Sequence, residues 1–332
     1  MRQRPILIAG AGSWGTALAM LVARNGHPAL LWGRDAAHVT TLSRERCNAR
    51  YLPGFVFPPL LSPVEELEEA LAQAGDVIVA VPVAGLRAVL EQIAVHAPPD
   101  VRISWACKGF EHDTLCLPHE VVEQMFSRDC PQAVLSGPSF AREVAAGVPT
   151  AIVVGSRDAA FAADLVARLH HGRFRAYRSE DVTGIEIGGA VKNVFAIAAG
   201  ISDGLGFGAN SRAALITRGL AEMMRLGEAM GAHRETFMGL AGLGDLVLTC
   251  TQDQSRNRRL GLALAAGRDL ATALKEINQT VEGVHTAGAV VQLAGRYGVE
   301  MPIAVEVARI LRGDTAPQAA VQTLLAREAT SE

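Results

Sequence analysis

Three glycines near the start of the chain constrain its fold more than any other feature. The segment Gly10-Ala-Gly12-Ser-Trp-Gly15 directly follows a short apolar run, Ile6–Ala9, and opens a stretch with helical periodicity over 14–25. A strand, glycines at this spacing and a helix are typical of the first turn of a βαβ unit that binds a dinucleotide. The first glycine permits a tight turn, the second lets the backbone approach a pyrophosphate, and the third lets the helix pack on the strand. The alternative is a glycine-rich turn that binds nothing.

The same glycines argue against a secretory signal at the N-terminus. The uncharged run 5–23 follows Met-Arg-Gln-Arg, an order that also begins signal peptides. The three glycines interrupt this run, however, and Arg24-Asn25-Gly26 closes it like the end of a helix, with Gly26 just after the last turn. We therefore expect strand, turn and helix here, and no membrane span elsewhere in the chain.

The pattern of apolar runs predicts two domains of different texture. Up to about residue 179, short β-rich runs alternate with amphipathic segments, which indicates βαβ units and a mostly parallel, doubly wound α/β sheet. The expected strands are 6–9, 29–32, 77–81, 102–106, 133–135 and 152–154, and the expected helices are 14–25, 35–46, 64–74, 85–96, 118–126 and 158–169. From residue 180, Ala, Leu, Met and Gly dominate at helical spacing. We expect a Rossmann-like dinucleotide-binding domain over 1–179 and an all-helical substrate domain over 180–332.

Composition excludes several classes of protein. The 332 residues hold 31 Lys and Arg against 34 Asp and Glu, and these charges are spread evenly, so a basic face for nucleic acid is not expected. The five cysteines include no C-x-x-C pair, which favours free thiols in a reducing cytoplasm. His170-His171 has no partner at ligand spacing, and we expect no metal site.

The end of the second expected strand, Leu31-Trp32-Gly33-Arg34-Asp35, bears on the choice of cofactor. Sites selective for NAD usually place a carboxylate here to bind the ribose 2′-OH, whereas an Arg accommodates a 2′-phosphate. Gly33 stands at the acidic position and Arg34 follows it, which predicts that NADPH is preferred and NADH accepted. Asp35 is either a ribose ligand displaced by one residue or the N-cap of the next helix.

Two later strand ends carry candidate substrate contacts. Ligands of open α/β sheets bind beyond the carboxyl ends of the strands. Lys108 follows one expected strand, and Ser136-Gly137-Pro138-Ser139-Phe140-Ala141 follows another. Lys108 is a candidate charge for the substrate or a solvated lysine. Ser139 is a candidate helix cap or hydrogen-bond donor to the substrate.

The segment Gly188-Gly189-Ala-Val-Lys192-Asn193 carries the most informative single charge. Lys192 is the only charged residue between Glu186 and Asp203, and helical spacing surrounds it with glycines and apolar residues. Burial on such a face lowers the pKa of a lysine toward the range that proton transfer requires. We expect the glycines to leave room for a substrate. The alternative is a lysine that reaches solvent or pairs with a structural carboxylate.

Two segments further along offer partners for this lysine and for a phosphate. Gly239-Leu-Ala-Gly242-Leu-Gly244-Asp245 is a glycine-rich turn that ends in a carboxylate, and we expect Asp245 to orient Lys192. Gln254-Ser255-Arg256-Asn257-Arg258-Arg259 places three guanidinium groups at an expected helix start, a combination that suits a phosphate dianion. For Arg258 and Arg259, a solvated basic helix face is the alternative.

These segments together resemble the bacterial NAD(P)-dependent sn-glycerol-3-phosphate dehydrogenases, which supply glycerol 3-phosphate for phospholipid synthesis. The resemblance covers nearly the whole chain in the right order. Its most specific pieces are GAGSWGTALA at 10–19, WACKG at 105–109, SGPSFAREVAAGVPTA at 136–151, GGAVKNVFAIAAG at 188–200, GLAGLGDLVLTCTQDQSRNRR at 239–259, VEG at 281–283 and GVEMPI at 298–303.

Carried to the matching positions, the resemblance implies a role for each of these segments. Lys192 is the proton donor or acceptor, and Lys108 and Asp245 complete the catalytic set. The cofactor residues are Gly10, Gly12, Ser13, Trp14, Gly15, Arg34, Lys108, Ala141, Arg256, Val281 and Glu282. The substrate residues are Lys108, Gly137, Ser139, Lys192, Asp245, Ser255, Arg256 and Asn257.

The implied reaction is reversible hydride transfer between the nicotinamide and C2 of dihydroxyacetone phosphate, with Lys192 exchanging a proton with the C2 oxygen. The resemblance also implies a small phosphorylated substrate and a cytoplasmic homodimer. Two alternatives belong to other classes. One is a related two-domain dehydrogenase that acts on a small 2-keto or 3-hydroxy acid, and the other is a nucleotide-sensing protein without chemistry, which would have no use for a lone lysine among glycines.

Overall fold

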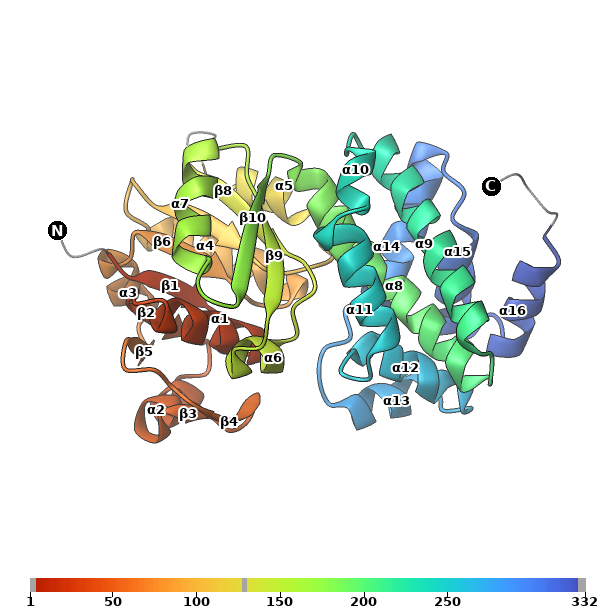
Figure 1. The fold of residues 1–332 in the computed structure, drawn as a ribbon, viewed down its shortest axis with the longest axis horizontal. Coiled ribbons are helices and arrows are strands. Elements are labelled where there is room, and N and C mark those ends of the chain that lie inside the picture. The colour runs from red at the N-terminus through yellow and green to blue at the C-terminus, as the bar shows by residue number, and fades with distance from the viewer. Residues whose placement is uncertain (1–3, 127–129, 328–332) are drawn as a thin grey trace. The chain divides into compact units, whose positions relative to one another are not determined.

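A computed structural model describes residues 4–126 and 130–327 of the chain, which form two compact units (Figure 1). Unit 1 comprises Met1–Glu111 and Cys116–Glu186, and unit 2 comprises His112–Leu115 and Ile187–Glu332. The sequence pattern predicts a change at 179–180, where the last strand of the sheet ends; the compact units divide at Glu186, inside the helix that follows.

Unit 1 is built on an eight-stranded sheet in the order β10-β9-β8-β7-β6-β1-β2-β5. Every neighbouring pair is parallel except β8 and β9, which confirms the predicted mostly parallel α/β fold. The strands are β1 (Ile6–Ala9), β2 (Ala29–Trp32), β5 (Leu61–Val64), β6 (Asp76–Val79), β7 (Arg102–Trp105), β8 (Gln132–Ser136), β9 (Thr150–Gly155) and β10 (Phe174–Ser179), beside a separate hairpin of β3 (Cys47–Asn48) and β4 (Leu52–Val56).

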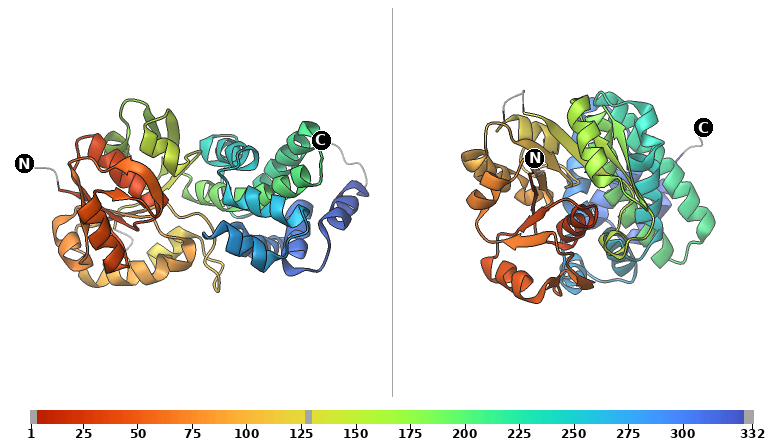
Figure 2. Two further views of the ribbon diagram at one scale, coloured as in Figure 1. Left: turned by 90° about the horizontal axis from the view of Figure 1, so that it is seen from below. Right: turned by 60° about the vertical axis from the view of Figure 1, so that its left-hand side comes forward.

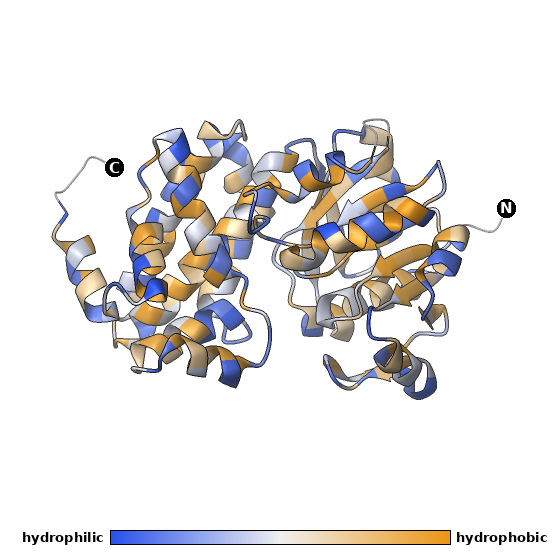
Figure 3. Ribbon diagram, turned by 180° about the vertical axis from the view of Figure 1, so that it is seen from behind, coloured by the Kyte–Doolittle hydropathy of each residue, from blue (hydrophilic) through white to orange (hydrophobic). Residues whose placement is uncertain are grey.

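Helices cover both faces of this sheet, as its parallel strands require. They are α1 (Ser13–Arg24), α2 (Ala36–Glu45), α3 (Leu67–Gln73), α4 (Leu86–His96), α5 (Pro118–Glu123), α6 (Ala141–Ala146) and α7 (Ala159–Leu169). In one layer, α6 and α7 both contact α1, and in a second, α3 and α5 both contact α4. Figure 2 shows α7 and α4 on opposite sides of the sheet. Strands β1 and β2 are apolar along their whole length and fully buried, and Figure 3 colours the sheet by hydropathy.

The first helix ends as its sequence predicts. Gly26 adopts a left-handed backbone with φ of +87°, its N–H donates to the Ala23 carbonyl, and the His27 N–H donates to the Val22 carbonyl. These two hydrogen bonds satisfy carbonyls in the last turn of α1, and a glycine reaches that conformation without strain. The segment is a strand, a turn and a helix, as expected.

All six expected strands are present, and the differences lie at the margins of the sheet. The strands β5 and β10 are not predicted, and β5 takes the start of the expected helix 64–74, so α3 begins only at Leu67. Pro63 in β5 and the alternation of buried and exposed residues over Phe174–Tyr177 in β10 are features of edge strands, which lack the continuous apolar run of a central strand. The expected helix 118–126 ends at Glu123.

The described part of unit 2 is helical, as predicted. Its elements are α8 (Val182–Gly204), which begins in unit 1, α9 (Ala209–Ala229), α10 (Arg234–Phe237), a π-helical turn η2 (Leu240–Gly244), α11 (Asp245–Thr251), α12 (Arg256–Ala265), α13 (Leu270–Ile277), α14 (Gly283–Tyr297), α15 (Pro302–Arg312) and α16 (Pro317–Leu325). Among the described helices, α8 alone is long and apolar enough to cross a membrane, and its apolar window is entirely buried. A helix that is apolar on all sides is the core helix of such a bundle.

Glycines let α12 pack directly on α8. A Cβ on Gly261 would collide with the Ile197 carbonyl oxygen, and one on Gly200 would collide with the Arg258 carbonyl oxygen. The backbones therefore touch where larger residues would hold the helices apart, and the first turn of α12 is held beside the residues that follow Lys192 on α8.

Candidate active site

The glycine turn in unit 1 has the geometry that its spacing predicts. Gly10 has φ of +134°, and a Cβ there would lie 2.5 Å from the Ala80 carbonyl oxygen. A Cβ on Gly15 would collide with the Gly10 carbonyl oxygen, so α1 packs closely on β1. Gly12 differs, because a Cβ there would meet nothing within 4 Å. Gly12 thus borders open space at the start of α1.

The start of α1 fits a nucleotide pyrophosphate. Gly12 is the N-cap residue of this twelve-residue helix, and no side chain caps it. The uncapped N–H groups and the positive end of the helix dipole favour an anion. Ser13 and Trp14, both half-buried, form the first residues of the helix.

A second segment holds this turn in place. The buried Asn48 amide donates to the Ala11 carbonyl oxygen at 3.0 Å and to Thr16 Oγ1 at 2.8 Å. The Asn48 side-chain oxygen accepts from the Tyr51 N–H at 3.1 Å. Sequence reasoning missed Asn48, because nothing in its local sequence marks a contact with residues more than thirty positions away.

The end of β2 has no room for the acidic residue of an NAD-selective site at position 33. A Cβ on Gly33 would lie 2.9 Å from the Ala11 Cβ. Arg34 is exposed beside it. Asp35 is the N-cap of α2, and its carboxylate accepts from the His38 N–H at 3.1 Å. Of the two roles considered for Asp35, the structure shows the helix cap.

At the ends of β7 and β8, the predicted substrate residues of unit 1 lie together. Lys108 Nζ donates to the Gly137 carbonyl oxygen at 3.2 Å, and Ser139 Oγ donates to the same oxygen at 3.0 Å. Gly137 has φ of +132°, which explains why a glycine stands there. Ala141 begins α6, but Ser139 does not cap it: the N-cap is Phe140, without a side-chain hydrogen bond. The expectation of a Ser139 cap is therefore wrong, because its hydroxyl bonds back to the turn.

In unit 2, Lys192 is buried in contact with the predicted carboxylate. Its Nζ donates to Asp245 Oδ1 at 2.5 Å, and the two side chains are 9% and 2% exposed. Nζ also donates to Thr249 Oγ1 at 3.1 Å. This burial excludes the alternative in which Lys192 reaches solvent. Asp245 is the kind of partner that a buried charge needs.

The backbone turn that precedes Asp245 explains the glycine at position 188. The turn η2 ends at Gly244, and Asp245 begins α11. A Cβ on Gly188 would lie 2.6 Å from the Ala241 carbonyl oxygen, so Gly188 makes room for η2. The expectation that Gly188 leaves space for a substrate is wrong at this position, because the chain itself fills that space.

Thr249 is a site residue that sequence reasoning missed. Its hydroxyl accepts from Lys192 and donates to the Asp245 carbonyl oxygen at 2.5 Å, one turn back along α11. Its position four residues after Asp245 places both side chains on one face of a helix. This spacing of four residues is the sequence signal that could have identified Thr249 as a neighbour of Asp245.

The first turn of α12 carries the predicted phosphate residues. Ser255 is the N-cap, and its Oγ accepts from the Arg258 N–H at 3.2 Å. Arg256 donates to the Thr280 carbonyl oxygen at 2.8 Å. Desolvation lowers the pKa of the Arg256 guanidinium, against the opposing charge of Glu282. A partly desolvated guanidinium beside a helix N-terminus favours an anionic partner.

Asn257 has structural bonds in the same turn. Its amide donates to the Asn193 side-chain oxygen at 2.8 Å, and its own oxygen accepts from the Gly283 N–H at 2.9 Å. These bonds join α12 to the residue after Lys192 and to the start of α14. The predicted cofactor residues Val281 and Glu282 immediately precede that start. The predicted residues of unit 2 thus converge on three helix starts and on Lys192.

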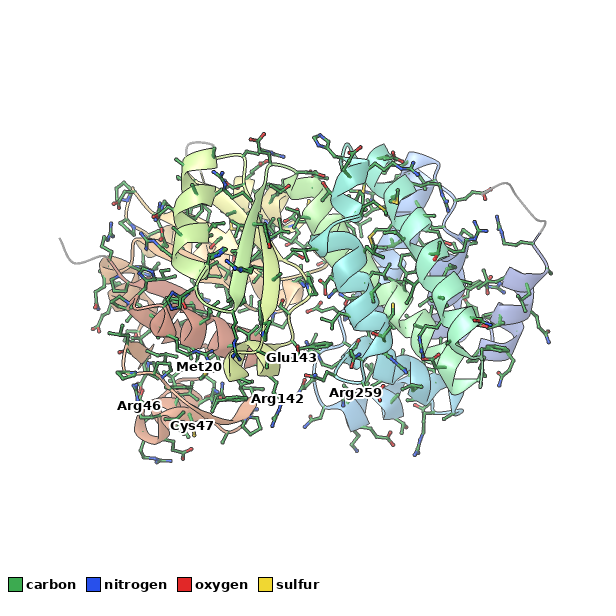
Figure 4. The ribbon with its side chains drawn as sticks, viewed as in Figure 1. Met20, Arg46, Cys47, Arg142, Glu143 and Arg259 are labelled. Atoms are coloured by element: carbon green, nitrogen blue, oxygen red, sulfur yellow. The ribbon has the colours of Figure 1, made fainter. Side chains whose placement is uncertain are left out.

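The two arginines that follow Asn257, Arg258 and Arg259, differ in their exposure to solvent. Arg258 is buried and pairs with Asp203 at 2.9 Å, so a solvated face is the wrong expectation for it. Arg259 is exposed, as that alternative expects (Figure 4). The difference follows from helix geometry, because successive residues point about 100° apart.

Comparisons with known proteins agree over nearly the whole chain. Residues 5–162 match the family model of the NAD-dependent glycerol-3-phosphate dehydrogenase N-terminus, and residues 181–322 match the model of its C-terminus. A glycerol-3-phosphate dehydrogenase [NAD(P)+] of Nitrosococcus oceani is 55% identical over 326 residues, covering 98% of this chain and 95% of that protein. One from Shewanella amazonensis is 55% identical over 328 residues, covering 98% and 97%. The crystal structure of glycerol-3-phosphate dehydrogenase from Coxiella burnetii superimposes with a TM-score of 0.95 at 47% identity, covering 98% of this chain and all of that one.

Proposed function

Because the chain belongs to the NAD-dependent glycerol-3-phosphate dehydrogenase family, we propose that it reversibly reduces dihydroxyacetone phosphate to sn-glycerol 3-phosphate with NADPH or NADH. The relatives of Nitrosococcus oceani and Shewanella amazonensis are named glycerol-3-phosphate dehydrogenases and are 55% identical to this chain over almost their full length. The observation that carries the proposal in this molecule is the buried contact between Lys192 and Asp245.

In unit 1, the glycine turn, Arg34, Lys108 and Ala141 are assigned to the cofactor, and Gly137 and Ser139 are assigned to the substrate. The uncapped start of α1 binds the pyrophosphate, and the open space at Gly12 allows its close approach. Without an acid at position 33, and with Asp35 engaged at its helix, the β2 end favours a 2′-phosphate over a bare ribose. We therefore propose a preference for NADPH, with NADH accepted. When bound, the nicotinamide supplies or receives the hydride.

Lys192 is assigned the proton. In the reducing direction, its ammonium group protonates the developing C2 alkoxide of the substrate and is left neutral, and it is reprotonated from solvent. Asp245 and Thr249 orient Nζ, since each accepts a hydrogen bond from it. Lys108 supplies a second positive charge for the C2 oxygen, a preorganised interaction of the kind that stabilises negative charge in transition states.

Arg256 and the first turn of α12 are assigned the phosphate of the substrate. A guanidinium fork and helix N–H groups suit a dianion. Ser255 and Asn257 shape this turn through the cap at Arg258 and the bonds to Asn193 and Gly283. A phosphate anchored this way contributes binding energy that positions C2, so we expect a substrate without phosphate to lose turnover as well as affinity.

The competing function is reduction of a small 2-keto acid or oxidation of a 3-hydroxy acid by a related dehydrogenase. Solved structures of D-mandelate dehydrogenase and of ketopantoate reductases share the fold at 14–18% identity, with TM-scores of 0.60–0.64. The family models and the relatives support the phosphorylated substrate. We also propose a homodimer in the cytoplasm, which size-exclusion chromatography with light scattering and cell fractionation would test.

The deciding experiment follows NADPH oxidation by the purified chain with dihydroxyacetone phosphate, dihydroxyacetone, or a 2-keto acid. We expect rapid oxidation only with the phosphorylated ketone. The K192A variant should lose activity by at least about a hundredfold while its NADPH affinity stays unchanged, because a positioned acid typically contributes that much. The matched control is K275A, an exposed lysine on α13. Near-normal turnover in K192A, or preference for the keto acid, would overturn the proposal.

A further inference from the structure

A cluster of four side chains stands at the end of β2, beyond Arg34. Asp35 and His38 come from the start of α2, and Arg50 and Tyr51 come from the turn between β3 and β4. The turn is tied to the glycine loop, because Asn48 bonds to Ala11, to Thr16 and to the Tyr51 N–H. These bonds therefore hold the cluster at a fixed position beside the glycine turn that is assigned to the pyrophosphate.

Arg50 lies between Asp35 and Tyr51 in this cluster. Its guanidinium lies over the Tyr51 ring, 5.0 Å from the ring centroid. One of its nitrogens is 3.6 Å from Asp35 Oδ2, and both side chains are about 60% exposed. Exposed pairs of this kind add little to stability. The pair matters instead because it places a positive charge beside the Asp35 carboxylate at the strand end.

The Asp35 carboxylate thus has two partners in the chain. Oδ1 accepts from the His38 N–H, and Oδ2 faces Arg50. A free carboxylate here would accept from a ribose 2′-OH and repel a 2′-phosphate. A carboxylate that already accepts a hydrogen bond at the helix cap and faces a guanidinium is a weaker acceptor for the ribose 2′-OH and repels a 2′-phosphate less.

The two rings of the cluster add a platform and an unsatisfied group. Tyr51 and His38 meet edge to face, with centroids 5.3 Å apart. The buried His38 Nε2 has no hydrogen-bond partner among the described residues. A buried polar atom without a partner is uncommon in a protein.

From these contacts we propose that Arg50 is the residue that selects the phosphorylated dinucleotide. It cancels the charge of Asp35 and, with Arg34, presents two guanidinium groups to the 2′-phosphate, while Tyr51 provides a face for the adenine. The inference rests on the dinucleotide site of the proposed function and deepens it. It assigns the selection to the pair of Arg50 and Asp35, where the sequence pattern points to Arg34 alone.

The test uses adenosine 2′,5′-bisphosphate and adenosine 5′-monophosphate as probes for the 2′-phosphate, titrated by calorimetry into the full-length protein. In R50A, we expect the affinity for the bisphosphate to fall by more than about tenfold, the typical effect of losing one charge-assisted bond. Affinity for the monophosphate should change little. R50K should retain part of the preference, and R44A, an exposed arginine on α2, is the matched control.

A double variant separates the two roles of Arg50. D35N keeps an oxygen for the helix cap but removes the charge. If Arg50 acts partly by neutralising Asp35, D35N/R50A should recover part of the bisphosphate affinity that R50A loses. An unchanged ratio of the two affinities in R50A would overturn this inference alone, since both probes would still bind. Failure of both probes to bind the wild-type protein would overturn the dinucleotide site as well. Neither readout requires turnover of dihydroxyacetone phosphate.

Discussion

Thr249 connects the lysine at the centre of the site to the helix that carries its carboxylate. The hydroxyl accepts from Lys192 and donates to the Asp245 carbonyl, so it holds Nζ on one side while Asp245 holds it on the other. A lysine placed by two partners keeps one orientation toward a bound substrate, whereas a single ion pair leaves the ammonium free to turn about it. We infer that Thr249 is a positioning residue.

The T249V variant tests this role at nearly constant volume. We expect kcat to fall by about tenfold, the cost of one hydrogen bond of roughly 1–1.5 kcal/mol, while KM for NADPH is unchanged. T249S should restore most of the turnover, which a purely structural role for the methyl group would not predict. The control is T251V on the same helix, where the exposed hydroxyl donates to the Val247 carbonyl. Equal losses in T249V and T251V would contradict the assignment.

At the scale of elements, close backbone contacts bring the ends of helices together. Gly200 and Gly261 let α8 and α12 touch, and Gly188 admits η2 beside α8. Helix α15 begins differently, on a carboxylate supplied by α9. The Glu222 oxygens accept from the Ile303 and Ala304 N–H groups at 2.8 and 3.2 Å, which caps α15 from a neighbouring helix.

This cap makes stability depend on pH. Burial raises the pKa of Glu222 from 4.5 to about 7, despite the two backbone hydrogen bonds. The folded chain then holds a proton that the unfolded chain releases above 4.5, so the contribution of Glu222 to stability falls as pH rises from 4.5 to about 7. The change amounts to about 3 kcal/mol.

The E222Q variant removes that proton equilibrium and keeps one acceptor for the helix start. Relative to the wild type, its free energy of unfolding should improve by up to about 3 kcal/mol between pH 4.5 and pH 8, measured by urea denaturation. E228Q, on the exposed side of α9, should show no such trend. Parallel pH profiles for E222Q and the wild type would show that Glu222 does not titrate in this range.

At the scale of the whole molecule, the proposed site residues are divided between the two units. Unit 1 carries the glycine turn and the strand ends, and unit 2 carries Lys192 and the first turn of α12. Because a ligand that binds only the folded state stabilises it by mass action, cofactor binding should register in the stability of the protein without any substrate.

The G12A variant exploits this linkage. A Cβ at Gly12 meets nothing within 4 Å in the chain, and the backbone there is extended, so stability without nucleotide should be unchanged. The added methyl group enters the space assigned to the pyrophosphate. NADPH at a hundred times its wild-type Kd should stabilise the wild type by about 2.7 kcal/mol and G12A by much less, measured as a shift in Tm. An equal shift in both proteins would place the pyrophosphate elsewhere.

Much of the fold can be predicted because its signals are local. The strands β1 and β2 have the predicted bounds, since buried parallel strands are continuous apolar runs between breakers. The edge strand β10 was missed because Arg175 and Tyr177 alternate with buried residues, a pattern that a helix surface or loop also produces. The ion pair of Arg258 could not be predicted, because its partner, Asp203, lies more than fifty residues away.

The sequence by itself determined the glycine turn, the α/β unit followed by helices, the family and the lysine at the centre of the proposed chemistry. Each of these depends on residue types at short spacing, because backbone conformation and periodic burial are set by near neighbours. Only the tertiary structure decided that Thr249 lies against Lys192, that Asp35 faces Arg50, and that Gly188 admits η2. Such contacts join residues far apart in sequence, and packing alone brings them within bonding distance.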